Sequence, residues 1–442
     1  MNFDILYPHT LAEYIKILAA RLPAKLKGLN LYFYIFLFLI SLQTTLAESQ
    51  KREDLSPESP YNINNSNREA GIKHDLKYNG CNGFIRGGYI QTNVKTINNA
   101  QAYSFGGELG CGISWGPFLK IHSSAFTAIN PGFNRGNKNA IQGDFFNQNK
   151  QSYITLGEAV MTLSYAGVEA HIGPQRFDSP HMDQDDLRLL PNIFEAYLID
   201  YHINQQFYLG SGFIRTAKGW ENNNNAEDFV GIGDAFGGNG SQSWISWGTY
   251  QQDNFNASAW YYYIKDVQQI FYIDMTYQNK LNDIFSYELG GQFDLGRSVG
   301  IQSIGLVDAT TLGVKATMSA YNTTLSIGYN KNFGQSAAVN SVGGGPFYTS
   351  MEQMTLDAIS AANAQALLLS LEYQPIEYLT LGLAIGDYQA KQKSDFHIQE
   401  LNTYLSFHYN QHFTIDIMYA PTKGFASIPS SEQYRVILGY QF

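Results

Sequence analysis

The sequence predicts an all-β protein: a transmembrane antiparallel β-barrel of about eighteen strands. Three observations predict it. Apolar and polar residues alternate with a period of two to the end of the chain, aromatic residues are abundant (31 Tyr and 28 Phe), and the last strand ends on Phe442. Alternation of period two indicates strands with two different faces, which a soluble β-sandwich would also show. The apolar faces often begin or end in Tyr or Phe, as in the aromatic girdles of membrane barrels, and this favours the membrane fold.

Closure follows from the membrane, because only helices and closed barrels satisfy every backbone polar group in lipid. Beyond the first fifty residues the sequence has no apolar run of about 18 residues, the length that a spanning helix needs. The formal net charge of -10 argues against a nucleic-acid partner, which would require a basic face, and fits a passage for cations better.

Residues 1-47 have the pattern of an export signal that is cleaved off. The apolar run Leu29 to Leu42 has about the length of a signal-peptide core, and basic residues such as Lys25 and Lys27 precede it. Thr45-Leu46-Ala47 offers small residues for cleavage, so the mature chain is expected to begin at Glu48. The alternative is a membrane anchor, for which the run is short. The true start codon is also open, because the basic region is long.

Residues 48-79 are polar and lack periodicity, which predicts a flexible periplasmic extension. Residues 80-442 form the predicted barrel domain. Its strands are expected to start near residues 83, 103, 118, 152, 167, 194, 206, 243, 255, 268, 284, 311, 322, 365, 377, 399, 412 and 433. The long connections 129-151, 175-193, 217-242 and 331-364 are expected to be extracellular loops. In the last of these, Met351 to Ala366 could form a short helix, because Ala, Met and Gln favour helix.

The last strand sets the register of the two faces. With Phe442 facing lipid, Tyr434, Val436 and Leu438 face lipid too, while Arg435 faces the lumen; only Ile437 breaks the pattern.

The two cysteines, Cys81 and Cys111, are expected on the first two strands. A turn centred on Asn98-Asn99 would not place them directly opposite each other. A disulfide is possible in an oxidising periplasm, and the alternative is two small, partly buried residues.

The most distinctive stretch is Gly173 to Glu195, a polar, charged connection between two strands. It either folds into the lumen and narrows it or is an ordinary solvated outer loop. This stretch resembles the constriction loop of the OprD-type outer-membrane porins, in Pro180, in the run Asp186 to Pro191 and in Phe194-Glu195. Gly343 to Tyr348 is similar to a second landmark of that family.

The resemblance implies an eighteen-stranded monomeric barrel with a narrow, substrate-selecting opening and an inward-folded constriction loop. By the same resemblance the opening would be lined by Asp183, Asp185, Asp186 and Arg188. Family members often carry a ladder of basic residues that guides carboxylates, and this chain departs from that pattern. The predicted lumen face carries three bases and six acids. It also carries His122, His171, His202 and His408, which are mostly neutral near pH 7. The predicted pore-lining residues are Lys120, Glu169, Asp200, Asp274, Glu288, Lys315, Glu372, His408, Asp416 and Arg435.

An excess of acids along a pore favours cations. We therefore expect a passive channel for small hydrophilic solutes with a cation bias, and no enzyme, because no compact Ser, His and acid grouping is evident in the sequence. The alternative is a β-barrel adhesin or surface receptor, using long loops with Trp220, Trp244 and Trp247 near them.

No cofactor and no metal site are expected. His181, Asp183, Asp185 and Asp186 could offer ligands to a hard cation such as calcium, but a solvated acidic loop is the simpler interpretation. The expected partners are the lipid bilayer with lipopolysaccharide, the barrel-assembly machinery, and small hydrophilic or cationic solutes. The barrel would be a monomer or a homotrimer.

Overall fold

The computed structural model describes residues 76-95, 99-134, 138-222, 225-390, 396-410, 412-425 and 427-442. The predicted export signal and all but the last four residues of the predicted extension lie outside these ranges. The first strand begins at Leu76, inside the stretch predicted to be the extension. No helix in the described part of the chain is long and apolar enough to cross a membrane.

Within the described residues, eighteen long strands follow one another along the chain. The first nine are β1 (Leu76–Val94), β2 (Ala100–Trp115), β3 (Leu119–Ile129), β4 (Tyr153–Tyr165), β5 (Val168–Gln175), β6 (Ile193–His202), β7 (Phe207–Lys218), β9 (Ser243–Gln252) and β10 (Phe255–Ile264). The other nine are β11 (Gln268–Lys280), β12 (Phe285–Ser298), β13 (Asp308–Ala320), β14 (Thr323–Gly334), β15 (Gln365–Ile376), β16 (Leu379–Gln389), β17 (His397–Tyr409), β18 (Phe413–Gly424) and β19 (Ser431–Gln441). Three short elements lie in the connections: the 3-10 turn η2 (Lys138–Ala140), β8 (Val230–Gly231) and α3 (Ile232–Ala235).

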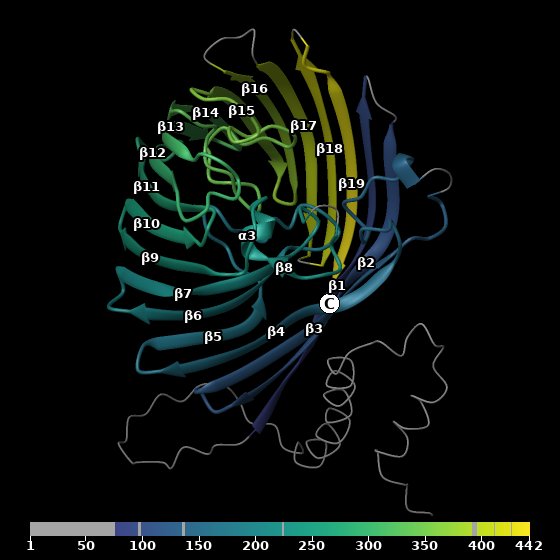
Figure 1. Cartoon of the computed structure of the whole chain (residues 1–442), viewed down its shortest axis with the longest axis vertical. Coiled ribbons are helices and arrows are strands. Elements are labelled where there is room, and N and C mark those ends of the chain that lie inside the picture. The colour runs from purple at the N-terminus through teal and green to yellow at the C-terminus, as the bar shows by residue number, and fades with distance from the viewer. Residues whose placement is uncertain are drawn as a thin grey trace, which may run out of the picture. The chain divides into compact units, whose positions relative to one another are not determined.

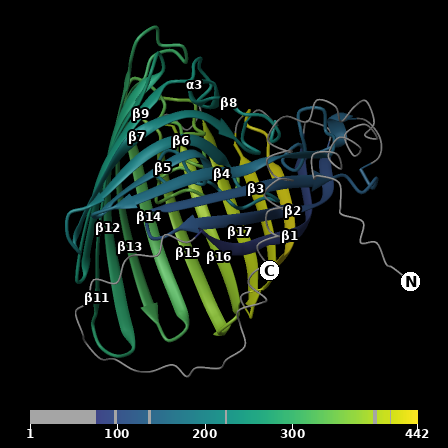
Figure 2. The ribbon, with the colours of Figure 1, turned by 90° about the horizontal axis from the view of Figure 1, so that it is seen from below.

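The strands close into an antiparallel barrel, as the sequence predicts. Each long strand pairs with its neighbours in the chain, and β1 also pairs with β19, so that Tyr89 lies between Tyr103 and Val436. Gly83 and Phe442 exchange two backbone hydrogen bonds of 3.0 Å at this seam. Figure 1 shows the purple-blue first strands beside the yellow last one, and Figure 2 shows the same ring of strands from below. Every predicted strand start falls within three residues of an observed one, except the first.

The two faces of the wall follow the alternation of the sequence. In β15, Leu367, Leu369 and Leu371 are exposed on the outside, whereas Ala366 and Leu368, which alternate with them, are buried. A strand whose successive side chains point to opposite faces separates lipid-facing from inward-facing residues in this way. Ile437, which breaks the pattern in β19, points inward and belongs to a buried apolar cluster with Ile90 and Phe145.

The interior is partly filled by the long connections, which bring apolar side chains onto the inner wall. One buried cluster joins Met182, Phe236 and Val342 from three connections, and another joins Phe145 and Leu189 from two. The connection after β14 supplies the third cluster, with Phe347, Leu356 and Ile359 among its members. Figure 1 shows α3 and β8 within the ring of strands. The long connections therefore cover the lumen instead of projecting only outward.

Two expectations about local structure are wrong. Cys81 and Cys111 lie directly opposite each other and form a disulfide, because β1 and β2 pair about a centre near residue 96 and not about Asn98-Asn99. No helix forms between Met351 and Ala364, where Met354 and Leu356 are buried in a shared apolar cluster, and β15 begins at Gln365. Tertiary packing overrides helix propensity here.

Candidate pore and its constriction

The connection between β5 and β6, residues 176-192, crosses the inside of the barrel. Its carboxylate Asp186 forms a two-pronged ion pair with Arg86 of β1, at 2.5 and 2.8 Å. Arg86 lies on the inner face, since its neighbour Ile85 is exposed on the outside. Leu189 is buried close to Gly106 of β2, where a side chain at position 106 would collide with it. The predicted inward fold of this connection is thus what the structure shows.

Arg188 links its own connection, residues 176-192, to the connections after β3 and after β14 through two ion pairs. Its Nε lies 3.0 Å from Asp144 in the connection after β3, and its Nη1 lies 3.0 Å from Glu352 in the connection after β14. Its guanidinium stacks over the ring of Trp220, 4.3 Å from the centroid. Glu352 also contacts Arg435 of the wall at 2.5 Å. Arg188 is only 5% exposed. Its charge is therefore taken up by carboxylates, and the residue acts as a cross-link.

Three carboxyl groups lie close together beside this cross-link. Burial raises the pKa of Asp185 to about 6, with the charge of Asp183 adding to the effect and Arg188 opposing it. Burial likewise raises the pKa of Glu221 to about 8, and the charge of Asp185 adds to it. The pKa of Asp183 is also raised by burial. Like charges that are partly buried together resist joint ionisation, so the charge of this group of carboxyls depends on pH.

His181 places residues 176-192 against β12 of the barrel wall. Its Nδ1 lies 3.0 Å from Ser341 Oγ, and its Nε2 lies 3.4 Å from Asp294 of β12, although without hydrogen-bond geometry. The rings of Tyr262 and Tyr272 meet the imidazole edge-on. His181 and Asp294 are fully enclosed, at 0% and 1% exposure. The structure thus assembles a Ser, His and Asp grouping that the sequence does not reveal. His181 therefore lies beside β12, whereas Asp186 is paired with Arg86 of β1.

The connection after β14, residues 335-364, lies against residues 176-192. Met182 and Val342 form a short bridge, and the Asp183 amide donates to the Val342 carbonyl at 2.9 Å. Gly343 has a left-handed φ of +107°, and a side chain there would meet the backbone of Asp183. Further along, Tyr348 donates to Asp274 of the wall at 2.6 Å. The Gly343 to Tyr348 stretch therefore lets two connections approach closely over the lumen.

The ten wall residues predicted to line the pore lie on the face opposite to the exposed apolar side chains. Their contacts divide them into two groups. The bases Lys315 and Arg435 are paired with Glu288 and Glu352, at 2.8 and 2.5 Å. Several acids have polar or histidine partners instead. These are Asp274 with Tyr348, Glu372 with Tyr404, Asp416 with Ser406 and His408, and Glu169 and Asp200 with His171. Lys120 has no carboxylate within ion-pair distance among the described residues.

Other charged residues of the inner wall and the connections were not predicted. Arg86 and Glu108 lie on β1 and β2, where glycines such as Gly87, Gly88 and Gly106 weaken the alternation, since glycine has no side chain to mark a face. Asp144 and Glu352 lie in connections without periodicity, where sequence pattern carries no register. Arg176 begins the inward connection and contacts Glu108.

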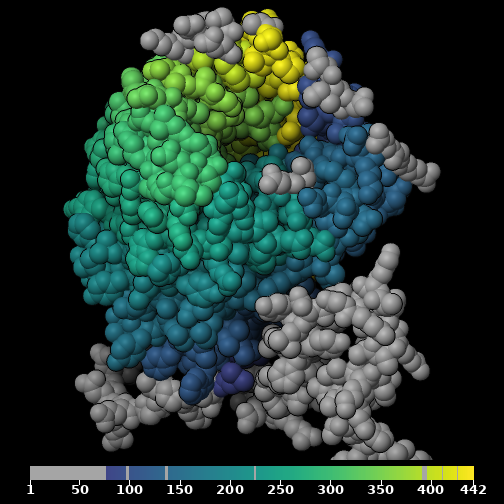
Figure 3. All heavy atoms as spheres, viewed as in Figure 1, coloured from purple at the N-terminus to yellow at the C-terminus, as the bar shows by residue number. Residues whose placement is uncertain are grey.

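The space-filling view in Figure 3 shows a hollow on this face of the molecule. It lies between the yellow-green C-terminal strands and the teal and blue connections.

The tryptophans proposed for an adhesin do not form a loop surface. Trp220 stacks on Arg188, Trp247 is buried, and Trp244 packs edge-on with Phe213 on the outside of the wall.

Comparison with known proteins agrees with this architecture. Residues 128-391 match the family model described as "outer membrane porin, OprD family". Among solved structures, OccAB3 from Acinetobacter baumannii superposes with a TM-score of 0.72 at 14% identity, covering 83% of this chain and 99% of that one.

Two proteins from Pseudomonas aeruginosa are also similar in structure. OccK9 (OpdG) has a TM-score of 0.73 at 14% identity, covering 84% of this chain and 100% of that one. OpdK, in a structure with vanillate, has a TM-score of 0.69 at 14% identity over the same shares. A comparison with curated protein sequences finds no match.

Proposed function

Because this chain belongs to the OprD family of outer-membrane porins, we propose that it is a passive channel for small hydrophilic solutes with a preference for cations. No chemical step is part of this proposal: selection would come from the width of the opening and the charge of its wall. OpdK has been seen with vanillate, an aromatic carboxylate, whereas the wall of this chain argues for solutes of the opposite charge.

The observation that carries the cation preference is the pairing of charges on the inner wall. Arg86, Lys315 and Arg435 each have a carboxylate partner, so their positive charge is locally compensated. By contrast, Asp274 and Glu372 accept hydrogen bonds from tyrosine hydroxyls, which carry no charge to compensate them. The wall field would then be negative, which raises the local concentration of cations in a low-dielectric passage.

The opening itself would be shaped by residues 176-192 and 335-364. In this proposal Asp183 presents negative charge at the opening, Asp186 is paired with Arg86, and Asp185 changes its charge near pH 6. Arg188 would hold the connections in place through Asp144 and Glu352.

The sign of the reversal potential tests the cation preference. The purified protein would be inserted into a planar bilayer separating two KCl concentrations. We expect the sign of the reversal potential to show that K⁺ passes more easily than Cl⁻. The double variant Glu372→Gln, Asp416→Asn removes two uncompensated acids without touching the connections, and should move the reversal potential toward zero.

The matched control is Glu377→Gln, Asp283→Asn, which removes two acids from short turns at strand ends. This variant should keep the wild-type reversal potential. A wild-type channel that prefers Cl⁻, or no open current at all, would refute the proposal.

Thiol accessibility tests whether Asp186 lies at the opening. Because Cys81 and Cys111 are bonded, Asp186→Cys introduces a single free thiol. We expect a bulky water-soluble thiol reagent to reduce the current through this variant and to leave wild type unchanged. An unaffected current after complete labelling would exclude residue 186 from the conducting path.

The remaining parts of the proposal concern delivery to the membrane. Residues 1-47 would direct export and be removed, and the barrel-assembly machinery would insert the barrel into a bilayer containing lipopolysaccharide. Analysis of the N-terminus of the membrane-extracted protein would test the cleavage, with Glu48 as the expected first residue. Sedimentation in detergent would decide between a monomer and a homotrimer.

A further inference from the structure

Three adjacent strands of the inner wall bring an imidazole between two carboxylates. Glu108 comes from β2, His122 from β3 and Glu158 from β4, and one potential ligand atom of each lies within 4.8 Å of the others. We propose that Glu108, His122 and Glu158 form a binding site for a divalent transition-metal ion such as Zn²⁺, which competes there with the side chain of Arg176.

The geometry needs only small side-chain movements to accept the ion. His122 Nε2 already lies 3.8 Å from Glu158 Oε2. Zinc bonds to nitrogen and oxygen of about 2.0–2.2 Å place the ligands of one ion roughly 3–4 Å apart. Two carboxylates and an imidazole are a known ligand type for zinc, and three protein ligands leave a position open to water.

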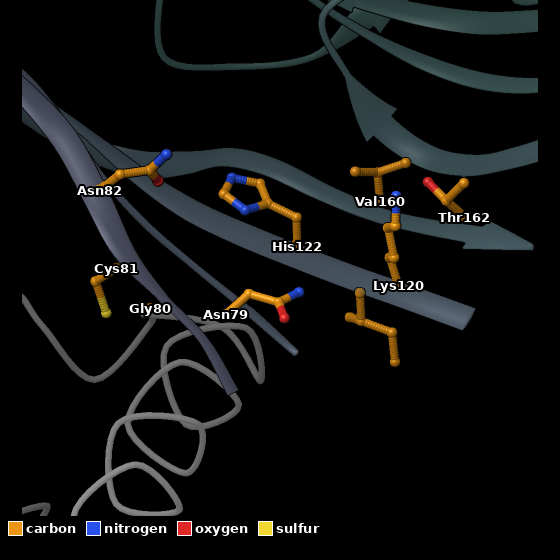
Figure 4. Close-up of a pocket in the computed structure, with 10 residues that line it drawn as sticks. Asn79, Gly80, Cys81, Asn82, Lys120, His122, Val160 and Thr162 are labelled. Carbon is orange, nitrogen blue, oxygen red and sulfur yellow. The ribbon is translucent and has the colours of Figure 1, made fainter. Parts of the chain in front are cut away.

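The wall is shaped to hold the imidazole. A Cβ at Gly110 would stand 2.7 Å from Cε1 and 2.8 Å from Nε2 of His122, so the glycine gives the ring room to lie against the neighbouring strand. Beside the ring is a pocket of about 260 Å³, lined by Asn82, Lys120 and Thr162 among others. Figure 4 shows the His122 ring in this pocket, between Asn82 and Val160. The pocket therefore leaves space beside the imidazole, the one of the three ligands that lines it.

The Arg176 guanidinium lies in this cluster, but one of its N–H groups has no hydrogen-bond partner among the described residues. Arg176 contacts the Glu108 carboxylate, and its Nε lies 3.5 Å from Glu158 Oε2. That Nε is buried and makes no hydrogen bond to any described residue. The two carboxylates carry two negative charges and the guanidinium one positive charge, so one negative charge remains with His122 neutral. A divalent ion would compensate both carboxylates.

If a metal ion displaced the Arg176 side chain, the effect would be felt at the start of the inward connection. Arg176 directly follows β5 and is the first residue of the inward connection. Its backbone N–H also donates to Glu158 Oε1 at 3.1 Å, so the ligand and the start of the connection are in contact. This inference goes beyond the proposed channel function and does not depend on the ion preference of the pore.

Isothermal titration of the full-length protein in detergent with Zn²⁺ alone tests the site. We expect saturable binding to wild type. His122→Gln and Glu158→Gln should weaken it by more than the roughly 10- to 100-fold that the loss of an outer-shell partner costs. Arg176→Gln should tighten it, because the competing cation is gone. The double variant His122→Gln, Arg176→Gln should bind more weakly than Arg176→Gln alone, which separates ligation by the imidazole from a general charge effect.

His408→Gln is the matched control, because His408 is another inner-wall histidine and has one carboxylate neighbour, Asp416, at 3.5 Å. It should bind Zn²⁺ like wild type. Absence of binding to wild type, or equal binding by wild type and His122→Gln, would overturn the inference. The KCl reversal potential of each variant, measured in parallel, reports on folding and on the channel proposal separately, so the metal site can fail while cation preference stands.

Discussion

A single carboxylate, Glu352, contacts two enclosed guanidinium groups. It contacts Arg188 at 3.0 Å and Arg435 at 2.5 Å, and all three side chains are almost fully buried. Removing one partner from a buried ion pair leaves charge that neither water nor protein compensates. The packing of residues 176-192 against the wall therefore depends on one residue that the sequence pattern does not mark.

For Glu352→Gln we expect the packing of residues 176-192 to weaken by roughly 3 kcal/mol, the lower end of what the loss of a buried partner costs. Amide hydrogen exchange in that connection should become about 100-fold faster, because local opening is governed by this free energy. The exposed Glu377→Gln in the β15–β16 turn is the control. Unchanged exchange in Glu352→Gln would contradict the assigned role.

His181 offers a second test at the scale of one residue. His181→Ala removes the ring between Tyr262 and Tyr272 and leaves Asp294 enclosed without its imidazole neighbour. We expect a local cost of about 2 kcal/mol from the polar group left without a partner. The measurement is exchange of the Val342 amide, which donates to the His181 carbonyl at 3.0 Å. His202→Ala, at the exposed end of β6, should leave that amide protected.

At the scale of the elements, alternation predicted the strands well and their pairing less well. The starts of β9, β10 and β11 were predicted to the residue, because their two faces differ clearly. Cys81 and Cys111 were misplaced, because the turn between β1 and β2 was centred on Asn98-Asn99, residues typical of turns. A shift of two to three residues in the turn moves every cross-strand partner.

The connections could be predicted only in part, for a different physical reason. Residues 176-192 could be recognised as inward by their resemblance to a family loop. The cross-link of Arg188 to Asp144 and Glu352 joins residues far apart in the chain and has no periodic signal. The Glu108, His122 and Glu158 cluster depends on the register of three strands, which the sequence did not fix on the glycine-rich β2.

The disulfide gives a prediction for the β1–β2 hairpin. Cys81→Ser, Cys111→Ser removes a cross-link that closes a chain segment of 30 residues. The chain-entropy relation gives a loss of roughly 3.5 kcal/mol as an upper value. We expect the variant barrel to unfold at a lower temperature, followed by its gel mobility without boiling. A reductant should lower the unfolding temperature of wild type and leave the variant unchanged; equal sensitivity of both would contradict the prediction.

For the whole molecule, the raised carboxyl pKa values predict a pH dependence of the opening. Packing holds the pKa of Asp185 at about 6 and that of Glu221 at about 8, above their ordinary values of 3.8 and 4.5. The packed state therefore binds protons more tightly than an opened state. Packing is favoured at low pH and loses this advantage as pH rises through about 6 and then about 8.

We expect single-channel conductance to be lower at pH 5 than at pH 8, because the connections pack more firmly when these groups are protonated. Conductance measured over this range in wild type should follow the two transitions. Asp185→Asn, Glu221→Gln should remove most of the dependence, since neither amide titrates. A variant that keeps the wild-type pH profile would show that other groups control it.

The seam between β1 and β19 has a consequence for how the molecule is made. The pairing of Tyr89 with Val436, and of Gly83 with Phe442, joins residues from the two ends of the described chain. Contacts so distant in sequence are slow to form. Until the last strand arrives, β1 and β18 would both carry a row of unpaired backbone groups, which lipid cannot satisfy and which invite pairing with other chains. Biogenesis must therefore shield two open edges at once, and the ring can be released into the bilayer only after its final residues have been delivered.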